Sequence, residues 1–532
     1  MNEPVAGGVG GNYPEPPSPD ESGRDRMTRN VLFSWAGQIV FLIAGFLMPR
    51  FIDRHIGQAG LGVWDFGWSV VNYFGLASIG IGSSVNRYVA KYRAEKDTES
   101  LNHAMSSVYC VQLIVAAVIF LITILATVFV PALLRSRLGV FEADAQWVIF
   151  FLGSSLAIQH AFNTYVGVMT GCHRWDHHNM INAGFYAGTV IAMLVGVSLG
   201  GGLRTLAISY CCGVLATEVC RVYVAKRVCP ELRIRFRLAR WGDAKRMLAF
   251  GGKTFVGSLS GRLLIQTNNI LVVTFLGPAA LAMYSRPMGL IGNVGAFVSK
   301  YAYLLTPIAS HLDAADMRKE LQDLVYRTTR YSVHMALPPI LFLCILGSPI
   351  LRLWMGKEYD HGLVLLILAV GGLVPIAHRP LMNVMTGLNA HGLPALANLA
   401  AAIGSVAMCL FLLGPMQGGL ASVAFSVSLS LVLVDGVFMP IYACRRIGLS
   451  TVDYLRHAWE QPILCSIPFA LCLVISRLVY SDQPATALLS GIFSGGTVIG
   501  VVYWRWVLPE SVRDKVIRFS KRIRMARVPD AL

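Results

Sequence analysis

The feature that most constrains this chain is a succession of apolar runs, each about twenty residues long, between residues 31 and 505. A helix of ~20 residues crosses a hydrocarbon core of ~30 Å. The composition agrees, because 55% of the residues are hydrophobic and only 14% are charged, whereas soluble domains carry ~25% charged residues. We therefore predict an all-α polytopic membrane protein rather than a barrel of ~10-residue alternating strands.

The pattern predicts about fourteen transmembrane helices, at residues 31–50, 61–84, 106–130, 146–169, 181–200, 205–224, 252–276, 280–305, 332–350, 362–385, 393–414, 418–441, 461–480 and 484–505. The loops between them are too short for a soluble catalytic domain, which argues against an enzyme. Residues 1–27 are rich in Gly, Pro and acidic residues, so we expect a disordered cytoplasmic tail rather than a signal peptide. The eleven cysteines show no metal-ligand spacing, and we expect no metal and no cofactor.

The formal net charge of +16 is sorted by loop rather than gathered on one surface. Most of the 45 lysines and arginines fall in alternate connecting segments and at the two ends of the chain. This bias predicts a multi-pass protein with both termini in the cytoplasm. It explains the positive charge by membrane topology rather than by nucleic-acid binding. Residues 509–532 alternate apolar and basic positions with helical spacing, so we expect a basic amphipathic helix on the inner leaflet, with a solvated tail as the alternative.

An internal repeat is visible in the sequence. The tetrapeptide VMTG occurs at 168–171 and again at 384–387, and GQAGLGVW at 57–64 aligns with GPAALAMY at 277–284. Spans one to six therefore match spans seven to twelve, which predicts two six-helix lobes related by a pseudo-twofold axis along the membrane normal, with a central cavity. The expected domains are a tail (1–27), an N-lobe (28–228), a basic cytoplasmic linker (229–249), a C-lobe (250–447), two extra helices (448–508) and the terminal helix (509–532).

Polar residues form stripes in several predicted spans. Arg286, Asn293 and Lys300 in the eighth span are seven residues apart, which places them on one face of a helix. The other striped or charged positions are Arg262, Gln266 and Asn269 in the seventh span, Asp65 and Asn72 in the second, and His378 and Arg379 in the tenth. A charge at bilayer depth costs at least ~2.5 kcal/mol, so we expect these stripes to face a wet cavity.

The cavity is predicted to be cationic in its second half, with Asp65 as the partner of Arg286 at similar depth. Arginine matches the geometry of phosphate oxygens and lysine binds them as a point charge. A substrate with a pyrophosphate or an acidic sugar would satisfy the four cations Arg262, Arg286, Lys300 and Arg379. The alternative is that each cation is bound by a backbone carbonyl or reaches a lipid headgroup.

Two acidic residues lie at equivalent positions in the sixth and twelfth spans. Glu218 and Asp435 are candidates for binding a proton or a sodium ion. Alternatively, they pair with the basic residues that follow, Lys226–Arg227 and Arg445–Arg446.

Two segments resemble a known family. GQIVFLIAGFLMPRFIDRHIGQAGLGVWDFGWSVVNYFGLASIGIGSSVNRYVAKYRAEKD at 37–97 and FGGKTFVGSLSGRLLIQTNNILVVTFLGPAALAMYSRP at 250–287 resemble polysaccharide (O-antigen/lipid-linked oligosaccharide) flippases, the Wzx-like branch of the multidrug/oligosaccharidyl-lipid/polysaccharide (MOP) exporter superfamily. The resemblance implies alternating access in the bacterial cytoplasmic (inner) membrane. It also implies flipping of undecaprenyl-pyrophosphate-linked oligosaccharide for surface polysaccharide synthesis, alongside a polymerase and glycosyltransferases.

The resemblance has one departure. Relatives often carry an aspartate nine residues before the loop glycine, whereas this chain has Asn268 before Gly277. An amide coordinates sodium through oxygen but cannot carry a proton, so Na⁺ and H⁺ coupling both stay open.

Three other functions are less consistent with the sequence. A cation-coupled multidrug (MATE-like) antiporter favours acidic and aromatic residues in its cavity. A membrane glycosyltransferase or polymerase needs paired carboxylates such as Glu142 and Asp144 beside a sizeable soluble region. Nothing in the sequence favours a membrane scaffold without transport.

Overall fold

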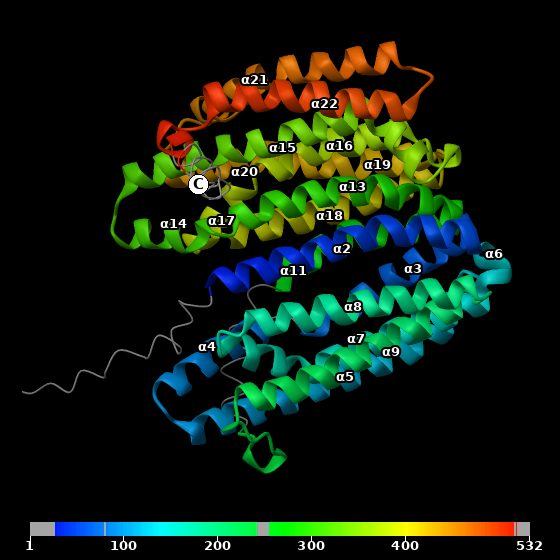
Figure 1. Ribbon diagram of the computed structural model, residues 1–532, viewed down its shortest axis with the longest axis vertical. Coiled ribbons are helices and arrows are strands. Elements are labelled where there is room, and N and C mark those ends of the chain that lie inside the picture. The colour runs from blue at the N-terminus through cyan, green and yellow to red at the C-terminus, as the bar shows by residue number, and fades with distance from the viewer. Residues whose placement is uncertain (1–26, 79–80, 241, 243–254, 515–517, 519–532) are drawn as a thin grey trace, which may run out of the picture. The chain divides into compact units, whose positions relative to one another are not determined.

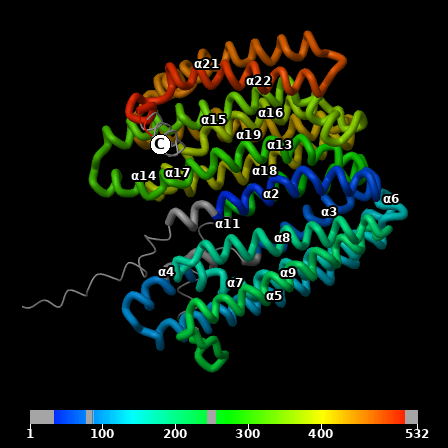
Figure 2. Tube along the Cα trace, in the orientation of Figure 1, coloured from blue at the N-terminus to red at the C-terminus, as the bar shows by residue number. Residues whose placement is uncertain are grey.

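The computed structural model describes residues 27–78, 81–240, 242, 255–514 and 518 (Figures 1 and 2). Within these residues the regular structure is helical, and 11 helices are long and apolar enough to cross a membrane. This confirms an all-α multi-pass membrane protein. The predicted tail lies outside the described residues except for Met27, and so do most of the predicted terminal helix and the end of the predicted linker.

The helices of the first half of the chain are long and are connected by short turns. Their bounds are α2 (Met27–Ile56), α3 (Gln58–Phe74), α4 (Ile81–Ala94), α5 (Thr98–Leu133), α6 (Arg135–Leu138), α7 (Glu142–Gly171), α8 (Trp175–Ser198) and α9 (Leu203–Val228). Three of the fourteen predicted spans, 61–84, 146–169 and 280–305, are not among the 11 apolar helices. The first of these is divided, because α3 ends at Phe74 and a 3-10 turn follows at Gly75–Ser78.

The second half repeats this order and contains three π-helical turns among its described residues, the last at Tyr503–Val507 after α22. Its helices are α11 (Phe255–Arg262), α12 (Asn268–Leu276), α13 (Pro278–Ala302), α14 (Leu305–Ala314), α15 (Arg318–Trp354), α16 (Gly362–Ala377), α17 (Arg379–Gly387), α18 (Gly392–Leu413), α19 (Leu420–Leu431), α20 (Met439–Ile447), α21 (Thr451–Val479) and α22 (Pro484–Val502). The π-helical turns Leu263–Thr267 and Val432–Phe438 join α11 to α12 and α19 to α20. The pair α21 and α22 packs against α15, side by side in Figures 1 and 2.

The backbone turns confirm the internal repeat. Gly57 and Gly277 each have a φ of 90° and directly precede α3 and α13. Positive φ values occur at matched positions throughout the two copies: Gly57 and Gly277, Lys96 and Asp316, Gly139 and Gly356, His173 and Asn389, Gly200 and Gln417. Since residues other than glycine rarely adopt positive φ, the repetition of these turns shows that the two halves share one backbone plan.

The chain divides into two compact units. The first contains residues 1–48, 74–126 and 150–255, and the second contains 49–73, 127–149 and 256–532. The second unit therefore includes most of α3 together with the end of α2, the end of α5 and the start of α7 from the first half of the sequence. The lobe boundaries proposed from the repeat stay a prediction.

The helices carry large apolar side chains on their outer surfaces. Ile114, Phe129, Leu471 and Phe493 are all more than half exposed, at 62%, 60%, 56% and 81%. Such exposure is costly in water but is expected where acyl chains surround the protein.

Gly62 of α3 is predicted to be essential for packing against α13. A Cβ added at Gly62 would lie 1.7 Å from the carbonyl oxygen of Pro278, whereas one added at Gly292 of α13 meets nothing within 4 Å. We expect Gly62→Ala to destabilise the protein by about 1–3 kcal/mol through overpacking. Thermal unfolding of the purified protein checks this, with Gly292→Ala as the matched control that stays at or above wild-type stability. Equal midpoints for the two variants would contradict the close approach.

Candidate functional site

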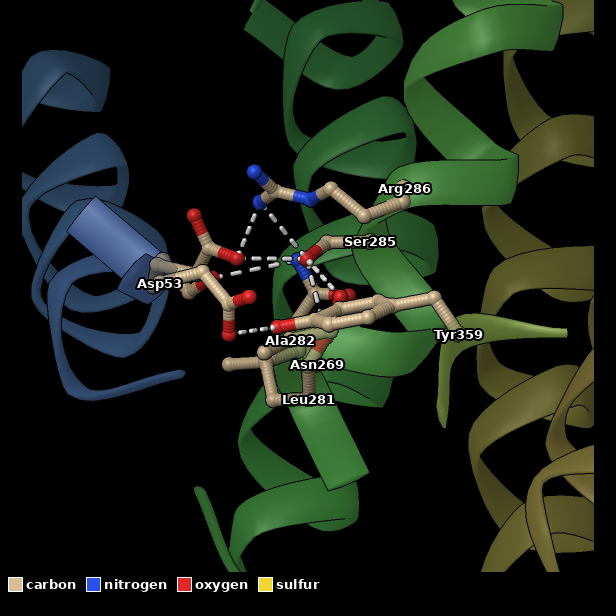
Figure 3. Close-up of polar contacts among 9 residues, drawn as sticks. Asp53, Asn269, Leu281, Ala282, Ser285, Arg286 and Tyr359 are labelled. Atoms are coloured by element: carbon tan, nitrogen blue, oxygen red, sulfur yellow. Dashed lines mark hydrogen bonds and ion pairs between the residues drawn. The ribbon is translucent and has the colours of Figure 1, made fainter. Parts of the chain in front are cut away.

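An ion pair between α3 and α13 forms the centre of the candidate site. The guanidinium of Arg286 donates to the Asp65 carboxylate, and the Ser285 hydroxyl donates to the same oxygen (Figure 3). The Arg286 and Asp65 side chains are only 8% and 16% exposed. The prediction that Asp65 is the partner of Arg286 is thus confirmed. The repeat accounts for the similar depth, because Asp65 is eight residues beyond Gly57 and Arg286 is nine residues beyond Gly277, so both lie about two turns into their helices.

Further hydrogen bonds extend from this pair within the second unit. Asn269 of α12 donates to the Ser69 hydroxyl at 3.1 Å, and Ser69 donates to the backbone carbonyl of Asp65 at 2.9 Å. Beside them, the Tyr359 hydroxyl donates to the Asp53 carboxylate at 2.7 Å (Figure 3). Neither Tyr359 nor Asp53 belongs to a polar stripe, and no local pattern indicates that they meet across 306 residues of sequence.

Arg262 lies at the end of α11 and has a different kind of partner. Its guanidinium donates to the backbone carbonyl of Asn72, and the Tyr73 hydroxyl contacts the Arg262 carbonyl at 3.4 Å and the Thr267 hydroxyl. Among the described residues no carboxylate pairs with Arg262. Its positive charge is therefore half-buried and balanced only by a carbonyl dipole.

The seventh predicted span is not a regular α-helix. The turn Leu263–Thr267 is π-helical, with i→i+5 spacing, and it includes Gln266. The prediction of one unbroken α-helical stripe through Arg262, Gln266 and Asn269 is therefore wrong. The two asparagines beyond the turn face different neighbours, because Asn269 contacts α3 while Asn268 contacts α18.

Asn268 is fully buried. Its amide nitrogen donates to the Leu264 carbonyl at 2.6 Å and to the Ser405 hydroxyl of α18 at 3.2 Å. Its side-chain oxygen Oδ1 has no hydrogen-bond partner among the described residues. A buried acceptor without a partner is unusual and costs free energy.

The other predicted cations lie apart from this cluster. Lys300 is fourteen residues beyond Arg286 on α13, which is ~21 Å along the helix axis. Lys300 and Asn293 are exposed, and Arg379 is exposed at the start of α17. The four cations therefore do not converge on one phosphate group.

Glu218 and Asp435 have partners other than those predicted. Glu218 is buried and pairs with Arg221 on the next turn of α9, not with Lys226–Arg227. The pair lines a cavity of about 270 Å³ in the first unit, together with the polar side chains of Gln159, Asn163, Asn182, Tyr186, Thr189, Tyr210 and Thr217. Residues three apart share a helix face, which gives Arg221 the advantage over more distant cations.

Asp435 lies in the second π-helical turn, near Arg379 rather than Arg445–Arg446. Its backbone carbonyl accepts a hydrogen bond from Nδ1 of the buried His378 at 2.6 Å, and Nε2 of His378 accepts from Trp459 of α21 at 3.3 Å. An indole can only donate, so His378 carries its proton on Nδ1. Within the described residues no group of three or more His, Cys, Asp or Glu side chains could hold a metal ion.

Breaking the Asp65–Arg286 pair from one side is predicted to cost more than removing it. Asp65→Ala leaves a buried guanidinium without a counter-charge, and we expect a loss of about 3–5 kcal/mol. Asp65→Ala/Arg286→Ala together should cost less than the sum of the single changes. A double-mutant cycle of unfolding free energies measures this coupling. Additive effects would show that the two side chains do not interact.

The chain is similar in sequence to several membrane proteins. The chain is 23% identical over 86% of its length, and 91% of the relative, to "Uncharacterized membrane protein EpsK" of Bacillus subtilis. It is 22% identical over 62% of its length, and 77% of the relative, to "Putative O-antigen transporter" of Shigella flexneri.

Two solved structures share the fold. "Lipid II flippase MurJ" in an inward closed conformation matches with a TM-score of 0.66 and 13% identity, over 91% of this chain and 100% of that one. An inward-facing MATE transporter of the MOP superfamily matches with a TM-score of 0.65 and 15% identity, over 76% of this chain and 94% of that one. A family model described as "Polysaccharide biosynthesis protein" matches residues 69–363, more than half of the sequence, and the chain therefore belongs to this family.

Proposed function

We propose that this chain is a flippase that moves undecaprenyl-pyrophosphate-linked oligosaccharide from the inner to the outer leaflet by alternating access. The family and the relatives named as O-antigen transporters support a role in exporting polysaccharide building blocks. The likeness to a lipid II flippase supports a lipid-linked substrate. The site of action would be the bacterial cytoplasmic membrane, with both termini in the cytoplasm and a polymerase and glycosyltransferases as partners.

The observation that carries this proposal is the charge of Arg262. A half-buried guanidinium whose described partner is a backbone carbonyl keeps most of its donors and all of its charge available. A phosphate offers the two parallel acceptors that a guanidinium fits, at roughly twice the strength of a neutral hydrogen bond. A pyrophosphate bound there would supply the missing counter-charge.

Arg286 is held by Asp65 in this conformation, so it can bind a phosphate only by exchanging partners. We infer that an incoming pyrophosphate competes with Asp65 for Arg286. Since Asp65 is on α3 and Arg286 on α13, this exchange would release one helix from the other. Substrate binding would thereby favour the conformational change of transport, because a ligand that binds one state better than another shifts the equilibrium toward that state. Lys300 and Arg379 would contact the substrate at another depth.

For ion coupling, the free Oδ1 of Asn268 is a suitable sodium ligand but cannot take up a proton. Glu218 and Asp435 are the carboxylates available for a proton. Gln266, Asn72, Asn269 and Asn293 would supply neutral hydrogen bonds to sugar hydroxyls.

The alternatives fit the residues less well. An organic cation would meet Arg286 on α13 and Arg262 at the end of α11, and an antiporter for cationic drugs would avoid such charges. A glycosyltransferase would need a free carboxylate pair on an outer loop, yet Glu142 is bound by Arg135 at 2.9 Å.

A complementation experiment tests the proposal. In a host that lacks its own flippase, Arg262→Ala should reduce surface polysaccharide by roughly 10–100-fold, because it removes charge-assisted hydrogen bonds. Arg262→Lys should retain part of the activity. Arg477→Ala is the matched control, since Arg477 of α21 also donates to a carbonyl, that of Ile345 at 2.7 Å, but lies outside the repeat.

Full complementation by Arg262→Ala at normal abundance would remove this residue from substrate binding. Increased tolerance of the host to cationic dyes on expression would instead support the antiporter.

A further inference from the structure

A basic segment that follows α9 is bound along the first unit in an ordered conformation. We call residues 231–240, ELRIRFRLAR, the arginine strap. The chain is extended at Arg235, and the apolar and basic residues of the strap alternate. Leu232 is buried and Ile234 packs against the same core cluster, whereas Arg233, Arg235, Arg237 and Arg240 are exposed. In the extended part of the strap the alternation leaves Arg233 and Arg235 exposed. Phe236–Leu238 form a 3-10 turn, and beyond it the guanidinium of Arg240 contacts Nε2 of His103 at 3.0 Å.

The strap is fixed to α5 by hydrogen bonds that use its backbone. Its N–H groups at Arg233, Arg235 and Arg240 donate to side chains of α5: Asn102 at 2.6 Å, Ser106 at 3.1 Å and Ser107 at 2.8 Å. In return, Asn102 donates to the Glu231 carbonyl at 3.2 Å and Nδ1 of His103 to the Leu238 carbonyl at 2.7 Å. These residues lie on one face of the first turns of α5, so this face of the helix binds the backbone of the strap along its length.

Only one end of the strap is neutralised. Arg93 of α4 pairs with Glu231 at 2.9 Å, which anchors the start of the strap. Burial alone would raise the pKa of Glu231, but hydrogen bonds from its own backbone and from Arg93 lower it, so the anchor stays charged at neutral pH. The guanidiniums of Arg233, Arg235 and Arg237 make no hydrogen bond or ion pair within the described part of the chain.

An aromatic ring lies among these arginines. Phe236 is 69% exposed, between Arg235 and Arg237, and its ring is 6.4 Å from that of Tyr109. An exposed phenylalanine flanked by unpaired arginines is poorly suited to water. The same combination suits a membrane interface, where the ring enters the acyl boundary and the arginines reach phosphates.

We propose that the arginine strap is a docking surface for anionic phospholipid headgroups of the inner leaflet. The strap connects directly to the end of α9 and lies on the start of α5. It is therefore at the ends of two apolar helices, which is where lipid headgroups would lie. The ordered backbone means that little conformational freedom is lost on binding. A soluble acidic partner would satisfy the arginines but would leave no reason for the exposed ring.

The experiment uses the full chain in a neutral detergent, with labelled phosphatidylglycerol as the probe and phosphatidylcholine as the uncharged comparison. Replacing the three arginines (R233Q/R235Q/R237Q) should weaken phosphatidylglycerol binding on the order of a hundredfold, because each basic residue near an anionic surface contributes separately. Phe236→Ser should weaken it severalfold. Asn102→Ala/Ser106→Ala keeps every charge but releases the backbone, and it should give an intermediate loss.

The matched control removes three charges from the start of α15 (R318Q/K319Q/R327Q), where Arg318 pairs with Asp316. It should keep wild-type binding. If the control loses as much phosphatidylglycerol binding as the strap variant, net charge alone explains the effect and the proposal is overturned. Unchanged binding in the strap variant would overturn it as well. So would competition by glycerol phosphate as effective as that by the lipid, since phosphate alone would then be recognised. Because no transport is measured, the result is independent of the flippase assignment.

Discussion

A hydrocarbon environment offers no water to a polar group, and the structure is arranged around that constraint. The described backbone satisfies it by forming helices, in which N–H and C=O groups bond within one segment. The side chains satisfy it in pairs. Arg286 is matched by Asp65 across two helices, and Glu218 by Arg221 within one. Arg262 is the exception among these charges, because a carbonyl dipole is its described partner. A charge left in this state is the feature on which the proposed binding of an anionic ligand rests.

The repeat explains why the central ion pair exists. Ser285 occupies the position in the second copy that Asp65 occupies in the first, 220 residues earlier, and the two side chains share a hydrogen bond. Arg286 is one residue further along α13 and donates to the same Asp65 carboxylate oxygen. The two copies share the glycine turns at 57 and 277, while the equivalent side chains differ: Asp65 is matched by Ser285, and Phe66 by Arg286.

The sequence was sufficient for features that depend on local pattern and on the repeat. Apolar runs gave the membrane class, and the alignment gave both the matched turns and the pairing of Asp65 with Arg286. The prediction failed where packing decides between alternative helix geometries or alternative partners. The π-helical turn at 263–267 widens the seventh span without any proline or glycine to mark it. Glu218 pairs with Arg221, three residues further on, rather than with the predicted Lys226–Arg227. The contact of Tyr359 with Asp53 joins the 3-10 turn Lys357–Tyr359 to the end of α2, and no sequence pattern relates the two.

This chain contains two kinds of arginine. Arg286 and Arg262 lie within apolar helices, where the first is paired with Asp65 and the second donates to a carbonyl. Arg233, Arg235 and Arg237 of the strap follow α9, and their guanidiniums have no hydrogen bond or ion pair within the described residues, while the strap backbone is bound to α5. If anionic lipids fill that surface, the first unit is anchored at the headgroup layer through the segment that leads into the second half of the chain. Motion of one copy relative to the other would then take place with the first unit fixed at the membrane surface. A substrate that carries phosphates would first meet the protein at a surface where lipid phosphates already gather.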